Sequence, residues 1–220
     1  MSTQTQPAVR ILPRKLLIAF PRYLSRLASL FISLNIKPNT LSLIALLTGL
    51  GAGVLFFLER PLWAGILIVI CGLFDILDGK VAVGSNQKSL FGAIFDSTLD
   101  RYSEFFIYLG LALHFRNHWA LWLTFFTILG STMVSYTRAR AEGLGIECKM
   151  GLMQRAERMV FLSLGSIVGA AFQILNPVMI GVLAIIAVIS NITAFQRAFY
   201  VKRIEKQRKL KKEVKSHGQN

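Results

Sequence analysis

Long blocks of apolar residues alternate with short polar segments along this chain of 220 residues. Most blocks are close to the roughly 20 residues that a helix needs to cross the apolar core of a bilayer. The pattern therefore predicts an all-α integral membrane protein with six transmembrane helices. The predicted spans run from Leu41 to Leu58, Leu62 to Leu77, Leu90 to Phe115, Trp119 to Tyr136, Met159 to Leu175 and Val178 to Tyr200.

The segment before the first span has a different pattern, in which basic and apolar residues are interleaved. This interruption argues against a cleavable signal peptide. It favours an amphipathic interfacial helix within residues 1–36, lying on an anionic membrane surface, with a disordered basic leader as the alternative. The basic residues are Arg10, Arg14, Lys15, Arg22 and Arg26, and the apolar ones include Leu12, Leu16, Ile18, Tyr23, Leu24 and Leu27.

Composition agrees with a membrane protein, because 54% of the residues are hydrophobic and only 16% are charged. The bases also indicate an orientation. With a cytoplasmic N-terminus, only Arg60 and Arg116 face the far side, and the other 23 of the 25 Lys and Arg residues lie on or near the cytoplasmic side. We therefore expect both termini and the active site to be cytoplasmic, in a cell inner membrane.

The expected organisation is an N-terminal segment over 1–36, a six-helix domain over 37–201 and a basic cytoplasmic tail over 202–220. In a soluble protein the tail would suit nucleic acid, but here we expect a lipid-attracted anchor and no nucleic-acid partner. Cys71 and Cys148 form no disulfide or metal-ligand pattern, so we expect them to be structural. The three histidines are scattered and are not expected to be catalytic.

Four of the 11 acidic residues lie at the end of one predicted span and the start of the next: Asp75, Asp78, Asp96 and Asp100. Ionisable groups at membrane depth are costly, so their presence indicates a function. Helical periodicity puts each pair on one face, and the polar linker between the spans makes them antiparallel neighbours. We therefore expect the four carboxylates to converge, although helix capping or an ion path is the alternative.

Four converging carboxylates would repel one another unless cations neutralise them. Carboxylate oxygens suit Mg²⁺ or Mn²⁺, which complete their coordination with water and substrate phosphate. A pair of such ions is able to orient a pyrophosphate and stabilise displacement at phosphorus. The sequence therefore predicts metal-dependent cleavage of a phosphate ester or anhydride.

The spacing of these residues resembles the signature of the CDP-alcohol phosphatidyltransferase family. That signature has two aspartates three apart, Gly, Ala-Arg, eight residues, Gly, and two aspartates four apart. This chain has Asp75, Asp78, Gly79, Ala82 and Val83, then eight residues to Gly92, Asp96 and Asp100. The resemblance extends from about Pro38 to Arg197.

The resemblance implies a homodimeric six-helix membrane enzyme that moves a phosphatidyl group from CDP-diacylglycerol to an alcohol and releases CMP. It implies that Asp75, Asp78 and Asp96 bind a first Mg²⁺ or Mn²⁺, and that Asp75, Asp96 and Asp100 bind a second. Asp100 would also take the proton of the attacking hydroxyl. The residues implied along the CDP-lipid are Pro38, Asn39, Thr40, Leu41, Gly79, Ala82, Val83, Ser89 and Gly92.

Val83 departs from the family pattern, which has Arg at this position. Loss of a two-pronged phosphate donor should weaken binding of the CDP-lipid unless Lys80 or Lys88 replaces it. A catalytically weakened lipid-binding scaffold is therefore one alternative function.

A cluster of arginines follows at the end of the fourth predicted span and before the fifth. Guanidinium groups match a phosphate monoester, so we expect an acceptor that already carries phosphate. The alternative is that these arginines only set topology and pair with Glu142 and Glu157. The expected acceptor-phosphate residues are Ser135, Arg138, Arg140, Arg155 and Arg158.

This stretch is also similar to the subgroup that makes phosphatidylinositol phosphate, whose segment reads Ser-Tyr-x-Lys-Ala-Arg-Ala-Glu and then Glu-Arg-x-Glu-Arg. Arg138 replaces a Lys and Gln154 replaces a Glu. By the same resemblance, Arg197 would add a phosphate contact. Inositol phosphate is the expected acceptor; a phosphatidylglycerophosphate synthase is the first alternative, and a cation pathway is the alternative from another class.

Overall fold

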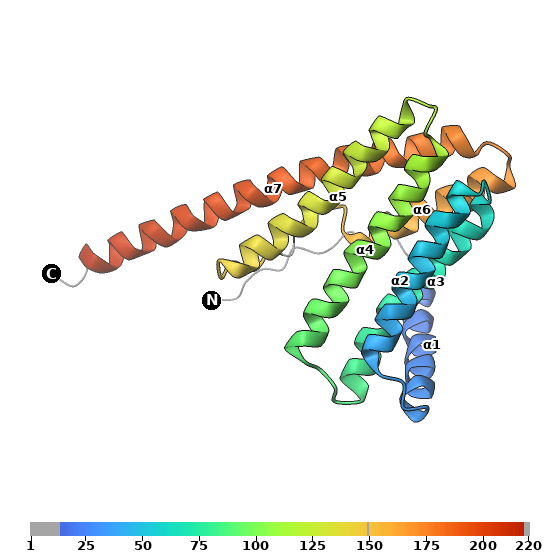
Figure 1. Cartoon of the computed structure of the whole chain (residues 1–220). Coiled ribbons are helices and arrows are strands. Elements are labelled where there is room, and N and C mark those ends of the chain that lie inside the picture. The colour runs from blue at the N-terminus through green and yellow to red at the C-terminus, as the bar shows by residue number, and fades with distance from the viewer. Residues whose placement is uncertain (1–13, 149, 218–220) are drawn as a thin grey trace.

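The computed structural model describes residues 14–148 and 150–217 (Figure 1). Every regular element in these residues is an α-helix, so the predicted all-α fold is confirmed for them. Arg10 and Leu12 of the predicted interfacial helix lie outside the described residues. The helices are α1 (Arg14–Ser33), α2 (Pro38–Phe57), α3 (Pro61–Gly84), α4 (Leu90–His114), α5 (Ala120–Gly143), α6 (Arg155–Ala171) and α7 (Leu175–His217).

Three helical segments in the described residues are long and apolar enough to cross a membrane: Pro38–Phe57, Ala120–Gly143 and Leu175–Lys209. α3 and α4 carry the four aspartates, and α6 begins at Arg155. A crossing by these three helices, which would complete the predicted six, stays a prediction. The three apolar spans define an integral membrane protein.

The helices form a bundle in which α4 lies between two groups of neighbours (Figure 1). α4 packs against α2 on one side and against α5 on the other, and α3 packs against α1, α2 and α6. α7 closes the bundle by packing against α5 and α6. Because α2 begins, α3 ends and α4 begins at the same end of the bundle, residues far apart in sequence meet there.

Close contact between α2 and α4 fixes how these two helices cross. A Cβ atom on Gly110 would collide with the backbone of Gly53, and one on Gly49 would lie 2.7 Å from Cβ of Ser103. Small residues therefore let the two backbones approach one another directly. This contact sets the register of α4, and hence the height of its aspartates relative to α2 and α3.

The predicted boundary between the last two spans was wrong. The sequence placed Leu175 at the end of one span, whereas α6 ends at Ala171 and α7 begins at Leu175. After α6 ends, the backbone turns at Gln173, which has a left-handed φ of 57°. Pro177 lies within the first turn of α7, where a missing N–H is tolerated because first-turn N–H groups have no intrahelical partner.

α7 contains 43 residues and would be about 65 Å long, which is far more than the apolar core of a bilayer requires. Its basic end extends beyond the other helices in Figure 1. The segment predicted as a basic tail is thus helical as far as His217. Arg208 Nη2 donates a hydrogen bond to the carbonyl of Gly145, 2.9 Å away, and so joins α7 to the loop after α5.

α1 packs along α3 at the end of the bundle that carries the aspartates. Leu24 and Ala28, one turn apart, are buried and form a small core with Leu41, Leu77 and Val81. This core supports the last turns of α3, from which Asp75 and Asp78 project.

Candidate metal and phosphate site

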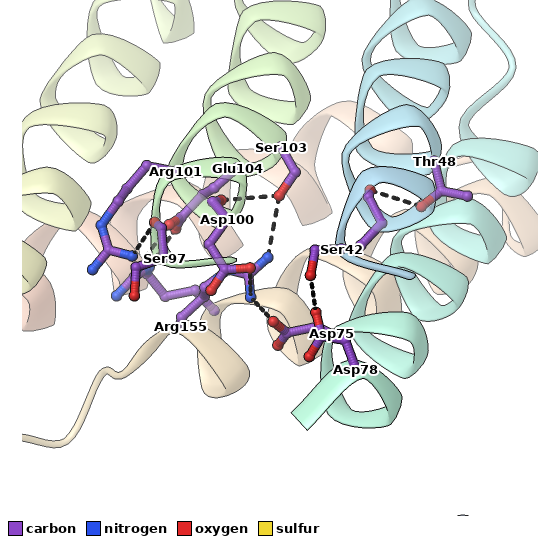
Figure 2. Close-up of polar contacts among 12 residues, drawn as sticks. Ser42, Thr48, Asp75, Asp78, Ser97, Asp100, Arg101, Ser103, Glu104 and Arg155 are labelled. Atoms are coloured by element: carbon purple, nitrogen blue, oxygen red, sulfur yellow. Dashed lines mark hydrogen bonds and ion pairs between the residues drawn. The ribbon is translucent and has the colours of Figure 1, made fainter. Parts of the chain in front are cut away.

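Asp75, Asp78 and Asp96 converge, as the sequence predicted. One carboxylate oxygen from each residue lies within 4.8 Å of the corresponding oxygen of the other two. Asp75 and Asp78 come from the C-terminal turns of α3, and Asp96 comes from the second turn of α4. Ser42 of α2 donates a hydrogen bond of 2.6 Å to Asp78 Oδ2, which fixes the orientation of that buried carboxylate (Figure 2).

The donor set fits a divalent metal ion. Asp96 Oδ1 is buried and has no hydrogen-bond partner in the described part of the chain. Such an oxygen is costly unless a cation or donor reaches it. Among the described residues this ligand group contains carboxylates alone, which matches the preference of hard cations for oxygen. Asp75, Asp78 and Asp96 are therefore the residues that would hold a metal.

Arg155, the first residue of α6, connects the remaining aspartate to this group. Its Nη1 lies 2.6 Å from Asp75 Oδ1 and 2.7 Å from Asp100 Oδ1, and its Nη2 donates to Ser103 Oγ at 3.1 Å (Figure 2). Burial acts to lower the pKa of Arg155, but the carboxylates of Asp100 and Asp75 outweigh it and raise that pKa. The guanidinium therefore stays protonated between the two helices.

One cavity, of about 490 Å³, adjoins the aspartates at the start of α2 and α4. Asp78 and Asp96 line it together with Ser42 and Lys88. Ser89 caps α4 by accepting a hydrogen bond of 2.9 Å from the N–H of Gly92, so the N-terminus of α4 borders this space. Six of the predicted CDP-lipid residues line it: Pro38, Asn39, Gly79, Ala82, Ser89 and Gly92.

Three other predicted CDP-lipid residues lie elsewhere. Thr40 and Leu41 do not line the cavity, and Leu41 is fully buried in the core beside α1. Val83 is exposed and lines a neighbouring cavity of about 570 Å³ between α1 and α3, together with Lys80. Gly79 borders both cavities, so the two spaces are adjacent.

A larger cavity, of about 630 Å³, lies on the other side of α4. Asp100 and Arg155 line it, so it reaches the acidic cluster from the side opposite to the cavity lined by Lys88. Of the predicted acceptor residues, Ser135, Arg138, Arg155, Arg158 and Arg197 line this cavity. Arg140 is exposed and does not line it, so its predicted role has no support from the geometry.

The arginines around this cavity differ in their partners. Arg138 Nε pairs with Glu142 Oε1 at 2.9 Å, and both side chains are more than 40% exposed, at 42% and 45%. Arg158 is fully buried, with Nε 2.5 Å and Nη2 2.8 Å from the two oxygens of Glu104. Arg197 donates to the carbonyls of Met150 and Val134. Arg158 and Arg197 are thus engaged in holding the protein together.

The loop between α5 and α6 depends on these buried arginines. Arg158 Nη1 donates to the carbonyl of Met153 at 3.1 Å, and Arg197 Nε donates to that of Met150 at 2.9 Å. Gly151 has a φ of 127°, and a Cβ there would lie 2.5 Å from Cγ2 of Thr193. Only glycine fits this position, and the loop then presents Arg155 to the aspartates.

The sequence reading missed two residues of the site. Glu104 lies one turn beyond Asp100, so the series Asp96, Asp100, Glu104 gave a signal of helical spacing that could have revealed it. Ser42 gave no such signal, since a serine near a helix start is common. Cys71 and Cys148 are buried and free, which agrees with the structural role expected for them.

Comparisons with known proteins agree with this arrangement. The sequence profile of the CDP-alcohol phosphatidyltransferase family matches residues 35–196. The archaetidylinositol phosphate synthase of Pyrococcus horikoshii is 37% identical over 82% of this chain and 91% of that protein. The phosphatidylinositol phosphate synthase of Streptomyces avermitilis is 34% identical over 84% of this chain and 80% of that protein.

Solved structures of the Mycobacterium tuberculosis phosphatidylinositol phosphate synthase also resemble this protein. The crystal structure with CDP-DAG bound superimposes with a TM-score of 0.74 at 26% identity, over 82% of this chain and 94% of that chain. The structure in complex with manganese and citrate gives a TM-score of 0.73 at 25% identity, over 81% and 88%.

The fold and the site define an all-helical membrane protein with an acidic centre suited to divalent metal. The chain belongs to the CDP-alcohol phosphatidyltransferase family. It is therefore an enzyme of phospholipid biosynthesis rather than a cation pathway.

Proposed function

We propose that this protein transfers a phosphatidyl group from CDP-diacylglycerol to inositol phosphate and releases CMP. The observation that carries the proposal is the position of the acidic cluster between two cavities, one bordered by Lys88 and the start of α4, the other by Arg138 and Arg155. Two substrates that each carry phosphate are able to approach the same carboxylates from opposite sides of α4. Inositol phosphate is proposed as the acceptor because the similar proteins are synthases of archaetidylinositol phosphate and phosphatidylinositol phosphate.

The first cavity suits the CDP moiety. The N-terminus of α4 favours anions, because its first N–H groups have no intrahelical partner and carry partial positive charge. Gly79 leaves open space where a Cβ would project, so a phosphate is able to approach the backbone of α3 closely. Two Mg²⁺ ions on the four aspartates, when bound, would neutralise the diphosphate and orient it for displacement.

The second cavity suits the acceptor. Arg138 and Arg155 would hold its phosphate, which places the acceptor hydroxyl beside Asp100. That hydroxyl oxygen attacks the phosphorus attached to diacylglycerol, and its proton passes to Asp100. The bond between this phosphorus and the oxygen of CMP breaks, and CMP leaves with the electron pair.

The proposal includes a membrane arrangement. α2 to α7 would make six crossings, α1 would lie at the cytoplasmic interface, and two copies would form a homodimer in a cytoplasmic membrane. The distribution of Lys and Arg supports this orientation, since the arginine cluster and the basic end of α7 would both be cytoplasmic. Anionic lipids would then attract the exposed bases near the end of α7.

A panel of acceptors tests the proposed reaction. Purified protein with CDP-diacylglycerol and Mg²⁺ should release CMP with inositol phosphate, but not with unphosphorylated inositol, because Arg138 and Arg155 would lack their phosphate. Chelation of the metal by EDTA should abolish release, and added Mg²⁺ should restore it. Release with glycerol 3-phosphate but not with inositol phosphate would instead identify a phosphatidylglycerophosphate synthase. Repeating the panel with an ether-linked CDP-lipid shows whether the protein uses a diacyl or an ether-linked donor.

The absence of an arginine at Val83 leads to a second prediction. Lys88 lines the cavity beside Asp78, so we expect it to replace the missing phosphate donor. Lys88→Met should raise the KM for the CDP-lipid about tenfold, with a smaller change in kcat, since a charged hydrogen bond contributes about 1.5 kcal/mol or more.

Val83→Arg provides the complementary measurement. The added guanidinium should change the KM of the wild-type protein little but restore much of the affinity lost in Lys88→Met. Lys80→Met, which changes a lysine of the neighbouring cavity, is the matched control and should leave the KM near its original value. A large gain in turnover from Val83→Arg alone would show instead that nothing compensates for the missing arginine.

A further inference from the structure

Arg155 is in contact with two parts of the site at once. One nitrogen, Nη1, bridges Asp75 of α3 and Asp100 of α4 at 2.6 and 2.7 Å. The same side chain lines the cavity that also contains Arg138. Its Nε is buried and has no hydrogen-bond partner in the described part of the chain, so one donor of the guanidinium is unsatisfied.

This bridge occupies carboxylate oxygens that a metal would need. A divalent ion binds carboxylate oxygens at about 2.0–2.2 Å when it is Mg²⁺ or of similar size. An ion bound to the same Oδ1 atoms of Asp75 and Asp100 would lie close to Nη1, and the two cations would repel one another at that distance. The guanidinium and an ion bound to these two Oδ1 atoms therefore exclude each other.

The bridge also affects Asp100 directly. Asp100 Oδ1 lies 2.7 Å from Nη1, so this contact occupies one of the two carboxylate oxygens of Asp100. Release of Arg155 would free Asp100 and would leave an unpaired guanidinium at the wall of the larger cavity. A phosphate group in that cavity would compensate the released charge.

We infer that Arg155 is a shared cation, held by Asp75 and Asp100 in the absence of metal and transferred to a phosphate in the larger cavity when a divalent ion binds, so that metal and phosphate bind with positive coupling. The inference rests on the proposed function, because it gives that reaction an order.

Binding measurements without the CDP-lipid test this coupling. The full chain in detergent is titrated with Mn²⁺ by calorimetry, with free Mn²⁺ followed by electron paramagnetic resonance, in the presence and absence of inorganic phosphate. Buffer blanks correct for complexes of Mn²⁺ with phosphate. Phosphate should raise the affinity for Mn²⁺ by about 5- to 150-fold, the usual range of coupling between sites. Reciprocally, Mn²⁺ should raise the affinity for phosphate by the same factor.

Arg155→Gln removes the shared cation. Without phosphate it should bind Mn²⁺ more tightly than the wild type, by about fivefold or more, and phosphate should then have little effect. Arg138→Gln is the matched control, because Arg138 lines the same cavity but pairs with the exposed Glu142. That control should weaken phosphate binding while leaving the affinity for Mn²⁺ alone unchanged.

Two results would overturn the inference. The first is the absence of coupling in the wild type. The second is coupling of wild-type size in Arg155→Gln, which would mean that metal and phosphate contact one another directly. If Arg155→Gln does not fold, Arg155→Lys preserves the charge but not the fork, and it should lose most of the coupling. Coupling without any CMP release would support the role of Arg155 and contradict the proposed reaction. CMP release without coupling would support the proposed reaction and contradict the role of Arg155.

Discussion

Asp100→Asn should lower the rate of CMP release by about a thousandfold, because the amide cannot accept the proton of the attacking hydroxyl and a positioned base contributes roughly 10²- to 10⁴-fold. The substitution also removes one of the two carboxylates that hold Arg155. CMP release under saturating CDP-diacylglycerol and inositol phosphate is the measurement.

Glu205→Gln is a suitable control for this experiment. Glu205 pairs with Lys209 on the exposed part of α7, 2.8 Å away, and neither residue lines the cavities of the site. The control should therefore retain its full rate. A decrease of less than tenfold for Asp100→Asn would mean that another group accepts the proton.

Glu104→Gln should strongly destabilise the protein. Arg158 is fully buried and forms two contacts with Glu104, so loss of the carboxylate charge leaves an uncompensated guanidinium inside the bundle. Removing one partner of such a pair costs about 3–5 kcal/mol. The unfolding temperature in detergent should fall by roughly 10 °C, as judged for a domain of this size.

The pair Arg138–Glu142 provides the matched comparison. It has a similar distance of 2.9 Å but is exposed, so Glu142→Gln should cost less than about 1 kcal/mol. Replacing both buried partners, by Glu104→Gln together with Arg158→Met, should be less damaging than Glu104→Gln alone, because no unpaired charge remains. Equal destabilisation by Glu104→Gln and Glu142→Gln would show that burial does not set the strength of these pairs.

The stability and function of the site are linked through the loop between α5 and α6. Arg158 anchors this loop to α4 through Glu104, and the same helix begins with Arg155. Glu104 thus holds the first turns of α6, where Arg155 lies, through its pair with Arg158.

The sequence alone predicted helices over all six apolar blocks, and it predicted that four aspartates would meet. Asp75, Asp78 and Asp96 do so, whereas Asp100 is joined to them through Arg155. Both predictions follow from local periodicity: an apolar block of the right length specifies a helix, and spacings of three or four place side chains on one face. The short polar linker between the two spans then made the helices antiparallel neighbours. The boundary at Leu175 was wrong because α7 begins at this residue, with Pro177 inside its first turn, where proline is tolerated.

The tertiary structure alone decided the partners of the arginines. In the sequence, Arg138, Arg155 and Arg158 belong to one cluster with the same predicted role. In the structure, Arg138 forms an exposed pair with Glu142, Arg155 bridges Asp75 and Asp100, and Arg158 is buried against Glu104. Residues about 50 positions apart meet only through the way that helices cross, which depends on contacts such as Gly53 against Gly110. Periodicity specifies which face of a helix a residue occupies, whereas packing between helices determines what that face meets.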